Sequence, residues 1–211
     1  MISKQRDPFS RPVPGFSLVE LLAVLVIIAV LVGAAVSMFG RSEAAMLRSG
    51  ADQLLAAIEQ ARTSAITRRR PVALAILEPG RGGFDDSACR LGLFELEDEV
   101  VDGAASGRLV QRWRTLPEGV VFFGGAVEAL DNVRDQPALS LRWKGGSEGD
   151  AVPALVFNPR GGLAYPPGSE SVVLTLGKGS YRNGEPLRTG ERGRRTIRVG
   201  RVVGRAWNLD A

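Results

Sequence analysis

Residues 21–40, LLAVLVIIAVLVGAAVSMFG, contain no charged side chain and a single hydroxyl group, that of Ser37. In a helix, twenty residues rise about 30 Å, which matches the hydrocarbon thickness of a bilayer. A buried core helix is a weaker interpretation, because such helices usually keep a polar stripe. A secretory signal peptide has an apolar region of only about 7–15 residues. The stretch therefore predicts a membrane-spanning helix.

The residues before this stretch predict its orientation. Lys4, Arg6 and Arg11 stand against Asp7 there, so the positive-inside rule leaves the first residues in the cytoplasm and places the rest of the chain outside. A single carboxylate, Glu20, lies at the start of the apolar helix. An ionised group in a membrane costs about 2.5–3.5 kcal/mol on insertion scales, so Glu20 is expected to meet a cation.

The segment around Glu20 resembles the signature of the type IV prepilin family: a short basic leader, a glycine, then Phe-[ST]-Leu-[IV]-Glu and an apolar helix. The matching residues are Gly15, Phe16, Ser17, Leu18, Val19 and Glu20. The resemblance implies that prepilin peptidase cleaves between Gly15 and Phe16, that the new Phe16 amine is methylated, and that the mature chain joins a filament. The Phe16 amine would supply the cation for Glu20. A plain signal anchor, the alternative, needs neither Gly15 nor Glu20.

The helical pattern continues beyond the apolar stretch as an amphipathic segment. Its apolar positions recur at spacings of three and four, which is one face of an α-helix: Leu47, Ala51, Leu54, Leu55, Ile58, Ala61, Ala65 and Ile66. No proline interrupts residues 16–70, so one helix is predicted from Phe16 to about Arg69, ended by Pro71. The basic run 68–70 complements the dipole at the helix C-terminus.

From Pro71 onward the pattern changes to short apolar runs separated by turn residues. Strands are predicted at Val72–Leu77, Leu91–Leu96, Leu109–Arg114, Val120–Phe123, Leu139–Trp143, Ala154–Phe157, Val172–Leu176, Thr196–Val199 and Val202–Trp207. Turns are predicted at 79–86, 102–107 and 145–150, and a long loop at 178–193. The fold class is therefore α+β, with the helix packed on an antiparallel β-sandwich. The expected domains are a leader at 1–15, a transmembrane or filament-core helix at 16–40, its amphipathic half at 41–70, and a β domain at 71–211.

Within the prepilin family, the globular part is similar to the minor pseudopilin H (GspH)/FimT group. The resemblance rests on three segments: the helix end at Ala61–Ile66 with Arg69, the segment Val156–Gly162, and the closing strands around Gly200–Val202. The part Asn158–Gly162 is also predicted as a hairpin turn on its own residues, with no need of a ligand.

The positive charge of the mature chain is concentrated in one C-terminal segment. The leader holds three positive charges and one negative, so +2 of the total +4 remains with the mature chain. Residues 186–205 carry seven arginines and one glutamate. Candidate binding residues there, for DNA or a partner, are Arg192, Arg194, Arg195, Arg198 and Arg201.

Alternation along a strand at 196–199 would place Arg194 and Arg198 on one face and Arg195 with Ile197 on the other. Guanidinium groups in a row can contact phosphates, and FimT-like proteins are associated with DNA capture through arginine-rich C-terminal segments. The segment resembles their Gly-Arg-x-Arg pattern only partly, since Thr196 stands where a second arginine is wanted. A basic edge strand that resists aggregation is the competing interpretation.

Composition argues against enzymatic chemistry. The chain has no histidine and one cysteine, Cys89, which excludes imidazole-based catalysis, internal disulfides and multi-cysteine metal sites. Asp85 and Asp86 match no calcium loop. No catalytic residue, cofactor or metal is predicted.

The leading hypothesis is a minor pilin-like subunit of the type II secretion pseudopilus. It would sit in the bacterial inner membrane by a single pass, with its C-terminal domain in the periplasm. Its partners would be prepilin peptidase and other pseudopilins or pilins. The alternatives are a FimT-type minor pilin that binds DNA for transformation, and an orphan prepilin-like surface protein.

Overall fold

The computed structural model describes residues 17–79, 88–143, 150–182, 184–189 and 193–210, with no side-chain placement for residues 33–42 and Asp150. The predicted helix is confirmed as α1, Leu18–Arg68. It ends where Arg69 takes a left-handed conformation, with φ of 55°, two residues before Pro71. The chain divides into two compact units, residues 1–42 and 43–211, which are described separately below.

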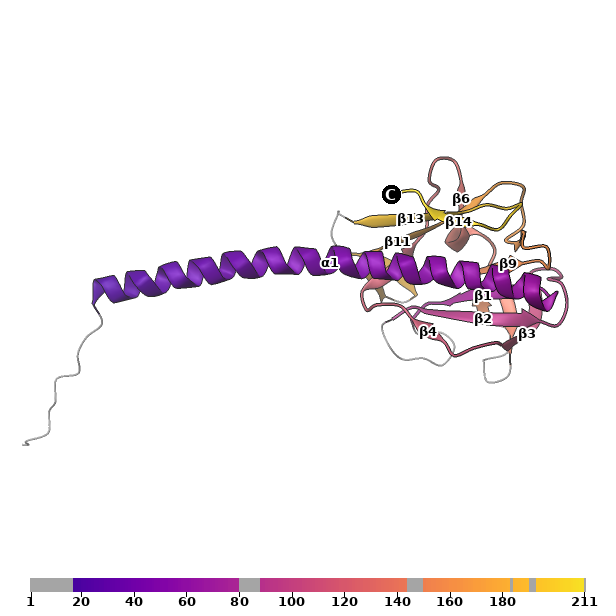
Figure 1. Ribbon diagram of the computed structural model, residues 1–211, viewed down its shortest axis with the longest axis horizontal. Coiled ribbons are helices and arrows are strands. Elements are labelled where there is room, and N and C mark those ends of the chain that lie inside the picture. The colour runs from indigo at the N-terminus through magenta and orange to yellow at the C-terminus, as the bar shows by residue number, and fades with distance from the viewer. Residues whose placement is uncertain (1–16, 80–87, 144–149, 183, 190–192, 211) are drawn as a thin grey trace, which may run out of the picture. The chain divides into compact units, whose positions relative to one another are not determined.

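Within the second unit, α1 buries one apolar stripe against the sheets. Leu54, Ile58 and Ala61 have no exposed surface, while Ala56 and Thr63 on the opposite side are exposed. In Figure 1 this half of the helix passes between β11 and β13 on one side and β1 and β2 on the other. The spacing of apolar residues therefore predicted most of the buried face, but Leu55 is only half-buried and Ile66, near the end of the helix, is 41% exposed.

The first sheet has the strand order β10-β9-β1-β2-β3-β7-β8, with β4 paired to β2. Its strands are β1 (Val72–Leu77), β2 (Arg90–Leu96), β3 (Ala104–Leu109), β4 (Arg114–Thr115), β7 (Leu139–Arg142), β8 (Asp150–Val152), β9 (Ala154–Phe157) and β10 (Leu163–Tyr165). Only Pro153 separates β8 from β9, and its carbonyl accepts a hydrogen bond from Ile76 N on β1 at 2.9 Å. The sheet therefore returns to β1 and closes on itself.

The second sheet is built on the long strand β11. Its order is β12-β11-β13-β14, and β5 and β6 also pair with β11. Its strands are β5 (Val120–Phe123), β6 (Asp131–Asn132), β11 (Val172–Arg182), β12 (Glu185–Arg188), β13 (Arg194–Val199) and β14 (Ala206–Asn208), and a 3-10 helix η1 (Val133–Asp135) follows β6. Most pairs in both sheets are antiparallel, but β3 with β7 and β11 with β6 are parallel. The α+β class is thus confirmed, and the purely antiparallel pairing is not.

Two apolar clusters follow from this arrangement. The larger joins the buried stripe of α1 to the inner residues of both sheets, such as Leu74, Phe122 and Leu174. The smaller fills the inside of the closed first sheet. There Phe94 contacts the rings of Trp113 and Trp143, with centroids 5.5 and 5.3 Å away.

Several strand predictions are corrected by the structure. The chain from 104 to 109 is strand β3, where a turn was predicted, and most of the predicted strand 109–114 is not a strand. The predicted long loop at 178–193 contains the end of β11 and all of β12. In place of the predicted strand at 202–207, residues 202 and 203 form a turn, and strand β14 begins only at Ala206. The predicted turns at 79–86 and 145–150 fall largely outside the described residues.

The predicted hairpin turn at Asn158–Gly162 is confirmed between β9 and β10. The Asn158 side chain accepts hydrogen bonds from the backbone N–H groups of Arg160 at 2.9 Å and Gly162 at 3.1 Å. Gly161 takes a φ of 85°, a conformation that favours glycine. These bonds account for the Asn-Pro-Arg-Gly-Gly sequence without a ligand.

Candidate functional site

The start of α1 is fixed by a serine. Ser17 accepts a hydrogen bond on its Oγ from Glu20 N at 3.2 Å, and its carbonyl accepts from Glu20 N and Leu21 N. Serine followed three residues later by glutamate is the sequence of a capping box. Helix geometry therefore begins immediately after Ser17. The predicted cleavage and methylation residues, Gly15 and Phe16, lie outside the described residues.

The first turns of α1 carry an unusually apolar surface. From Leu18 to Val32, the large apolar side chains are between 48% and 82% exposed, and Glu20 is the one charged residue among them. Such a continuous apolar surface normally marks a contact with lipid or with other proteins. Across the described residues, no helix combines the length and the apolar character needed to cross a membrane.

The predicted basic residues of the C-terminal segment differ in their exposure and in their hydrogen-bond partners. One of them, Arg192, lies outside the described residues. Arg194 is exposed at the start of β13. Arg195 is half-buried, and its Nη1 donates to the Asp210 carbonyl at 3.3 Å. The alternation along β13 places Arg194 and Arg198 on the face opposite the buried Ile197 and Val199.

Arg198 and Arg201 are engaged by the fold itself. The Arg198 guanidinium lies 5.3 Å from the ring centroid of Trp207, in cation–π geometry. Arg201 donates from Nε to the Glu170 carbonyl and from Nη1 to the Pro166 carbonyl, each at 2.7 Å. Burial lowers the pKa of Arg201 from its usual value. Arg201 therefore does not extend a row of free guanidinium groups. Of the predicted row, Arg194 is exposed, and Arg198 lies on the same face of β13 but stacks on Trp207.

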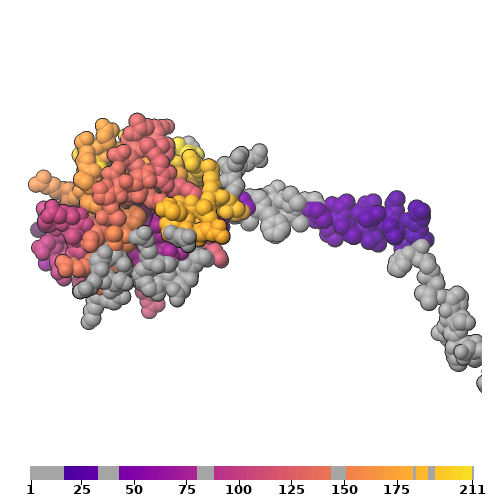
Figure 2. Space-filling view, turned by 180° about the vertical axis from the view of Figure 1, so that it is seen from behind, coloured from indigo at the N-terminus to yellow at the C-terminus, as the bar shows by residue number. Residues whose placement is uncertain are grey.

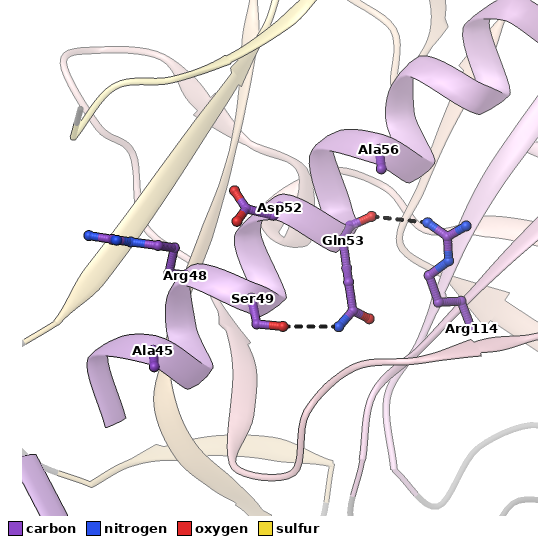
Figure 3. Close-up of a pocket in the computed structure, with 7 residues that line it drawn as sticks. All are labelled: Ala45, Arg48, Ser49, Asp52, Gln53, Ala56 and Arg114. Carbon is purple, nitrogen blue, oxygen red and sulfur yellow. Dashed lines mark hydrogen bonds between the residues drawn. The ribbon is translucent and has the colours of Figure 1, made fainter. Parts of the chain in front are cut away.

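A hollow of about 480 Å³ lies on the outer side of α1 (Figure 3). It is lined by small and polar side chains: Ala45, Arg48, Ser49, Asp52, Gln53, Ala56 and Arg114. Arg114 Nη1 donates to the Gln53 carbonyl at 3.4 Å, and Gln53 Nε2 donates to Ser49 Oγ at 3.3 Å. The Ser49 hydroxyl in this open hollow is thus bonded to an amide rather than to the Asp52 carboxylate.

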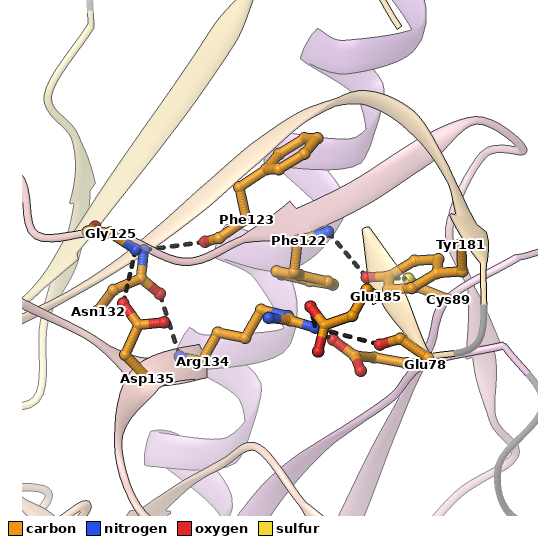
Figure 4. A network of polar contacts seen from close by, with 11 residues as sticks. Glu78, Cys89, Phe122, Phe123, Gly125, Asn132, Arg134, Asp135, Tyr181 and Glu185 are labelled. Atoms are coloured by element: carbon orange, nitrogen blue, oxygen red, sulfur yellow. Dashed lines mark hydrogen bonds and ion pairs between the residues drawn. The ribbon is translucent and has the colours of Figure 1, made fainter. Parts of the chain in front are cut away.

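A buried polar network joins the two sheets (Figure 4). Glu78, at the end of β1 and only 4% exposed, accepts a hydrogen bond from Arg134 Nε at 2.9 Å. Cys89 donates to Tyr181 Oη at 3.4 Å, and that oxygen accepts from Phe122 N at 3.1 Å. Burial raises the pKa of Cys89 to about 12. Burial also raises the pKa of Tyr181.

Both the Cys89 thiol and the Tyr181 phenol are therefore held in their neutral forms, and the hydrogen bond from Phe122 N ties β5 to β11. Sequence reasoning missed Glu78 and Arg134 because neither belongs to a motif. The signal was a carboxylate directly after the apolar strand Val72–Leu77, which predicts a buried charge that needs a partner.

Among the described residues, no three acidic, cysteine or histidine side chains come together as a metal site would require. Glu95 instead faces three arginines, Arg68 at 2.7 Å, Arg108 at 3.7 Å and Arg70 at 3.9 Å. Asp85 and Asp86 lie outside the described residues.

Comparison with protein families agrees with the segments described above. A model of the prokaryotic N-terminal methylation motif matches residues 11–36. Together with the helix and the α+β domain behind it, this match defines a type IV prepilin-like protein. A second model, "Type II transport protein GspH", matches residues 50–201. The chain belongs to the GspH family, since that match covers well over half of it. No significant match was found among curated proteins or among solved structures.

Proposed function

We propose that this chain is a minor pseudopilin that assembles into the type II secretion pseudopilus and supports protein export. In this proposal, prepilin peptidase cleaves the chain after Gly15 and Phe16 is methylated. The helix at residues 16–40 holds the unassembled subunit in the inner membrane by a single pass, with the C-terminal domain in the periplasm. The role is structural rather than catalytic.

The observation that carries the proposal is the presence of both family matches on one chain, the methylation motif at 11–36 and the GspH region at 50–201. The exposed apolar surface from Leu18 to Val32 supports it, because that surface needs a partner or lipid. Glu20 supports it as well: a lone carboxylate in such a surface is costly unless a cation such as the Phe16 amine neutralises it.

The first test is mass spectrometry of the protein from cells that express prepilin peptidase. The mature N-terminus is expected to be methylated Phe16. An N-terminus that still begins at Met1 in peptidase-positive cells contradicts the proposal.

The second test is Glu20→Ala. Cleavage is expected to persist, while incorporation into the filament is impaired, because the carboxylate no longer neutralises the terminal amine of its own or a neighbouring chain. The matched control is Glu59→Ala on the same helix, which removes an exposed partner of Arg62. Normal incorporation of Glu20→Ala refutes the assigned role.

A second candidate function is that of a FimT-type minor pilin that binds DNA for transformation. One observation favours it: Arg194 and the Arg198–Trp207 pair lie on one face of the second sheet, and aromatic rings interleaved with arginines suit nucleic acids. A gel shift with the full chain in detergent tests it. Binding should weaken steeply with salt and be lost in Arg194→Glu, whereas the control Arg182→Glu should bind normally. Absence of a shift at low salt removes this candidate.

A further inference from the structure

The turn between β13 and β14, residues 200–205, exposes two valines on a firmly held backbone. Val202 is 88% and Val203 is 57% exposed. The Arg201 carbonyl accepts a hydrogen bond from Leu163 N at 2.8 Å. The Val203 carbonyl accepts one from Arg62 Nε on α1 at 2.6 Å. The turn is thus tied to β10 and to α1.

The same turn is also held by close packing against the β9–β10 turn. A Cβ atom on Gly204 would lie 2.0 Å from the Gly161 carbonyl oxygen, so the turn lies directly on the β9–β10 turn. The Arg201 side chain adds its hydrogen bonds to the carbonyls of residues 166 and 170. An apolar pair presented by a rigid backbone loses little conformational entropy when it is bound, which favours its use as an anchor.

Exposed cations lie beside these valines. Arg160, in the β9–β10 turn, and Arg205 are both exposed. In the described part of the chain, neither of them has an acidic side chain at ion-pair distance. We call Arg160, Val202, Val203 and Arg205 the basic tip. Its chemistry fits an apolar contact surrounded by carboxylates.

The same domain carries a surface of that kind in the β2–β3 turn. Val101 there is 66% exposed. The carboxylates around it are all exposed, and among the described residues none forms an ion pair. We call this set the acidic turn: Glu97, Asp98, Glu99, Val101 and Asp102. Figure 2 shows the segment around it, in dark magenta, at the surface of the globular unit.

Both surfaces lie at the end of the domain where α1 finishes. Val72, at the start of β1, is paired with Glu95 on one side and with Phe157 on the other. The acidic turn follows β2, and the basic tip lies against the start of β10. Three inter-strand spacings of about 4.8 Å separate β2 from β10. The two surfaces therefore lie on opposite sides of the end of the domain where α1 finishes.

We propose that the basic tip of one copy docks on the acidic turn of a second copy, side by side. Val202 and Val203 contact Val101, and Arg160 and Arg205 face the carboxylates around it. Because two different surfaces meet, the contact is heterologous, which is the kind that extends into a ring or a helical filament. This inference deepens the proposed function and rests on it.

The test is a disulfide cross-link between differently tagged full-length copies in membranes of cells that express prepilin peptidase. One copy carries Val101→Cys and the other Val202→Cys. The native Cys89 is fully buried and does not compete. The matched control pairs Val101→Cys with Thr63→Cys, an exposed position on α1. The expected result is a mixed-tag dimer about tenfold more abundant than in the control pair, which corresponds to a modest contact free energy.

Charge reversal makes the test specific. Arg160→Glu/Arg205→Glu on the copy carrying Val202→Cys should reduce the dimer several-fold, and Glu97→Lys/Glu99→Lys on the other copy should restore it. The proposal is overturned if no mixed dimer forms, if Val202→Cys alone dimerises equally well, or if the tip cross-links only to a different pilin-like subunit. Methylated Phe16 and filament incorporation are measured in the same cells, so failure of the contact is distinguished from failure of the proposed function.

Discussion

Truncating one buried side chain of α1 tests whether the second half of the helix is part of the domain core. Leu54 has no exposed surface and belongs to the cluster that joins the helix to both sheets. Leu54→Ala removes three carbon groups, worth about 2.4 kcal/mol at roughly 0.8 kcal/mol each. The cavity left behind adds to this, so a loss of about 3–4 kcal/mol in the free energy of unfolding is expected.

The assay is urea denaturation of the purified protein in detergent, followed by tryptophan fluorescence. Trp113 and Trp143 report unfolding because both rings pack on Phe94 inside the first sheet. The matched control is Ile66→Ala, on the same helix but 41% exposed, which should cost less than about 1 kcal/mol. At about 2–4 °C per kcal/mol for a domain of this size, Leu54→Ala should also lower the Tm by roughly 6–16 °C.

An equal and small loss of stability in Leu54→Ala and Ile66→Ala refutes the reasoning, because the helix would then contribute no core. If Leu54→Ala shows the expected loss but the slope of the free energy of unfolding against urea concentration also changes, the substitution has altered the unfolded state as well.

Three further predictions concern the sheets. Gly92→Ala places a Cβ 2.4 Å from Trp113 Cζ3, so the ring must move: a loss of about 1–3 kcal/mol and a shifted tryptophan emission are expected, and unchanged emission contradicts the packing. Cys89, whose pKa burial raises to about 12, stays protonated at pH 8, so iodoacetamide should label it only in urea; rapid labelling of the native protein contradicts its burial. Arg134→Met leaves Glu78 buried without its cation and should cost about 3 kcal/mol, most of which the added change Glu78→Gln should recover in a double-mutant cycle; additive losses mean that the two side chains are not coupled.

The elements that sequence predicted well are those in which burial alone fixes the structure. The helix pattern predicted α1 to within two residues at its start and one at its end. The boundaries of β1, β5 and β9 match the predicted ones, since each strand is an almost uninterrupted apolar run. Strand β3 was missed because its sequence, Ala-Ala-Ser-Gly-Arg-Leu, is small and polar. It is held by backbone pairing to β2 and β7, which leaves no hydrophobic pattern.

The hairpin of β11 and β12 was missed for a different reason. Its residues are polar because the hairpin is largely exposed, so the hydrophobic pattern predicts a loop there. The Asn183-Gly184 dipeptide between its strands is a strong signal for a tight hairpin, and Gly184 has a φ of 79°. Turn chemistry, rather than apolar spacing, was the informative feature in this segment.

The arginines of the C-terminal segment show why a count of charges overstates a binding surface. Sequence gives residues 186–205 a net charge of +6, and each arginine counts equally in that sum. In the fold, Arg201 donates to two carbonyls and Arg198 stacks on Trp207, so both hold the closing strands in place. Arg205 lies beside two exposed valines instead of in a row with Arg194. Because a guanidinium that already donates to carbonyls must break those bonds to reach a phosphate, Arg201→Ala should destabilise the domain more than it weakens any binding to DNA. A loss of DNA binding in Arg201→Ala at unchanged Tm contradicts this structural role.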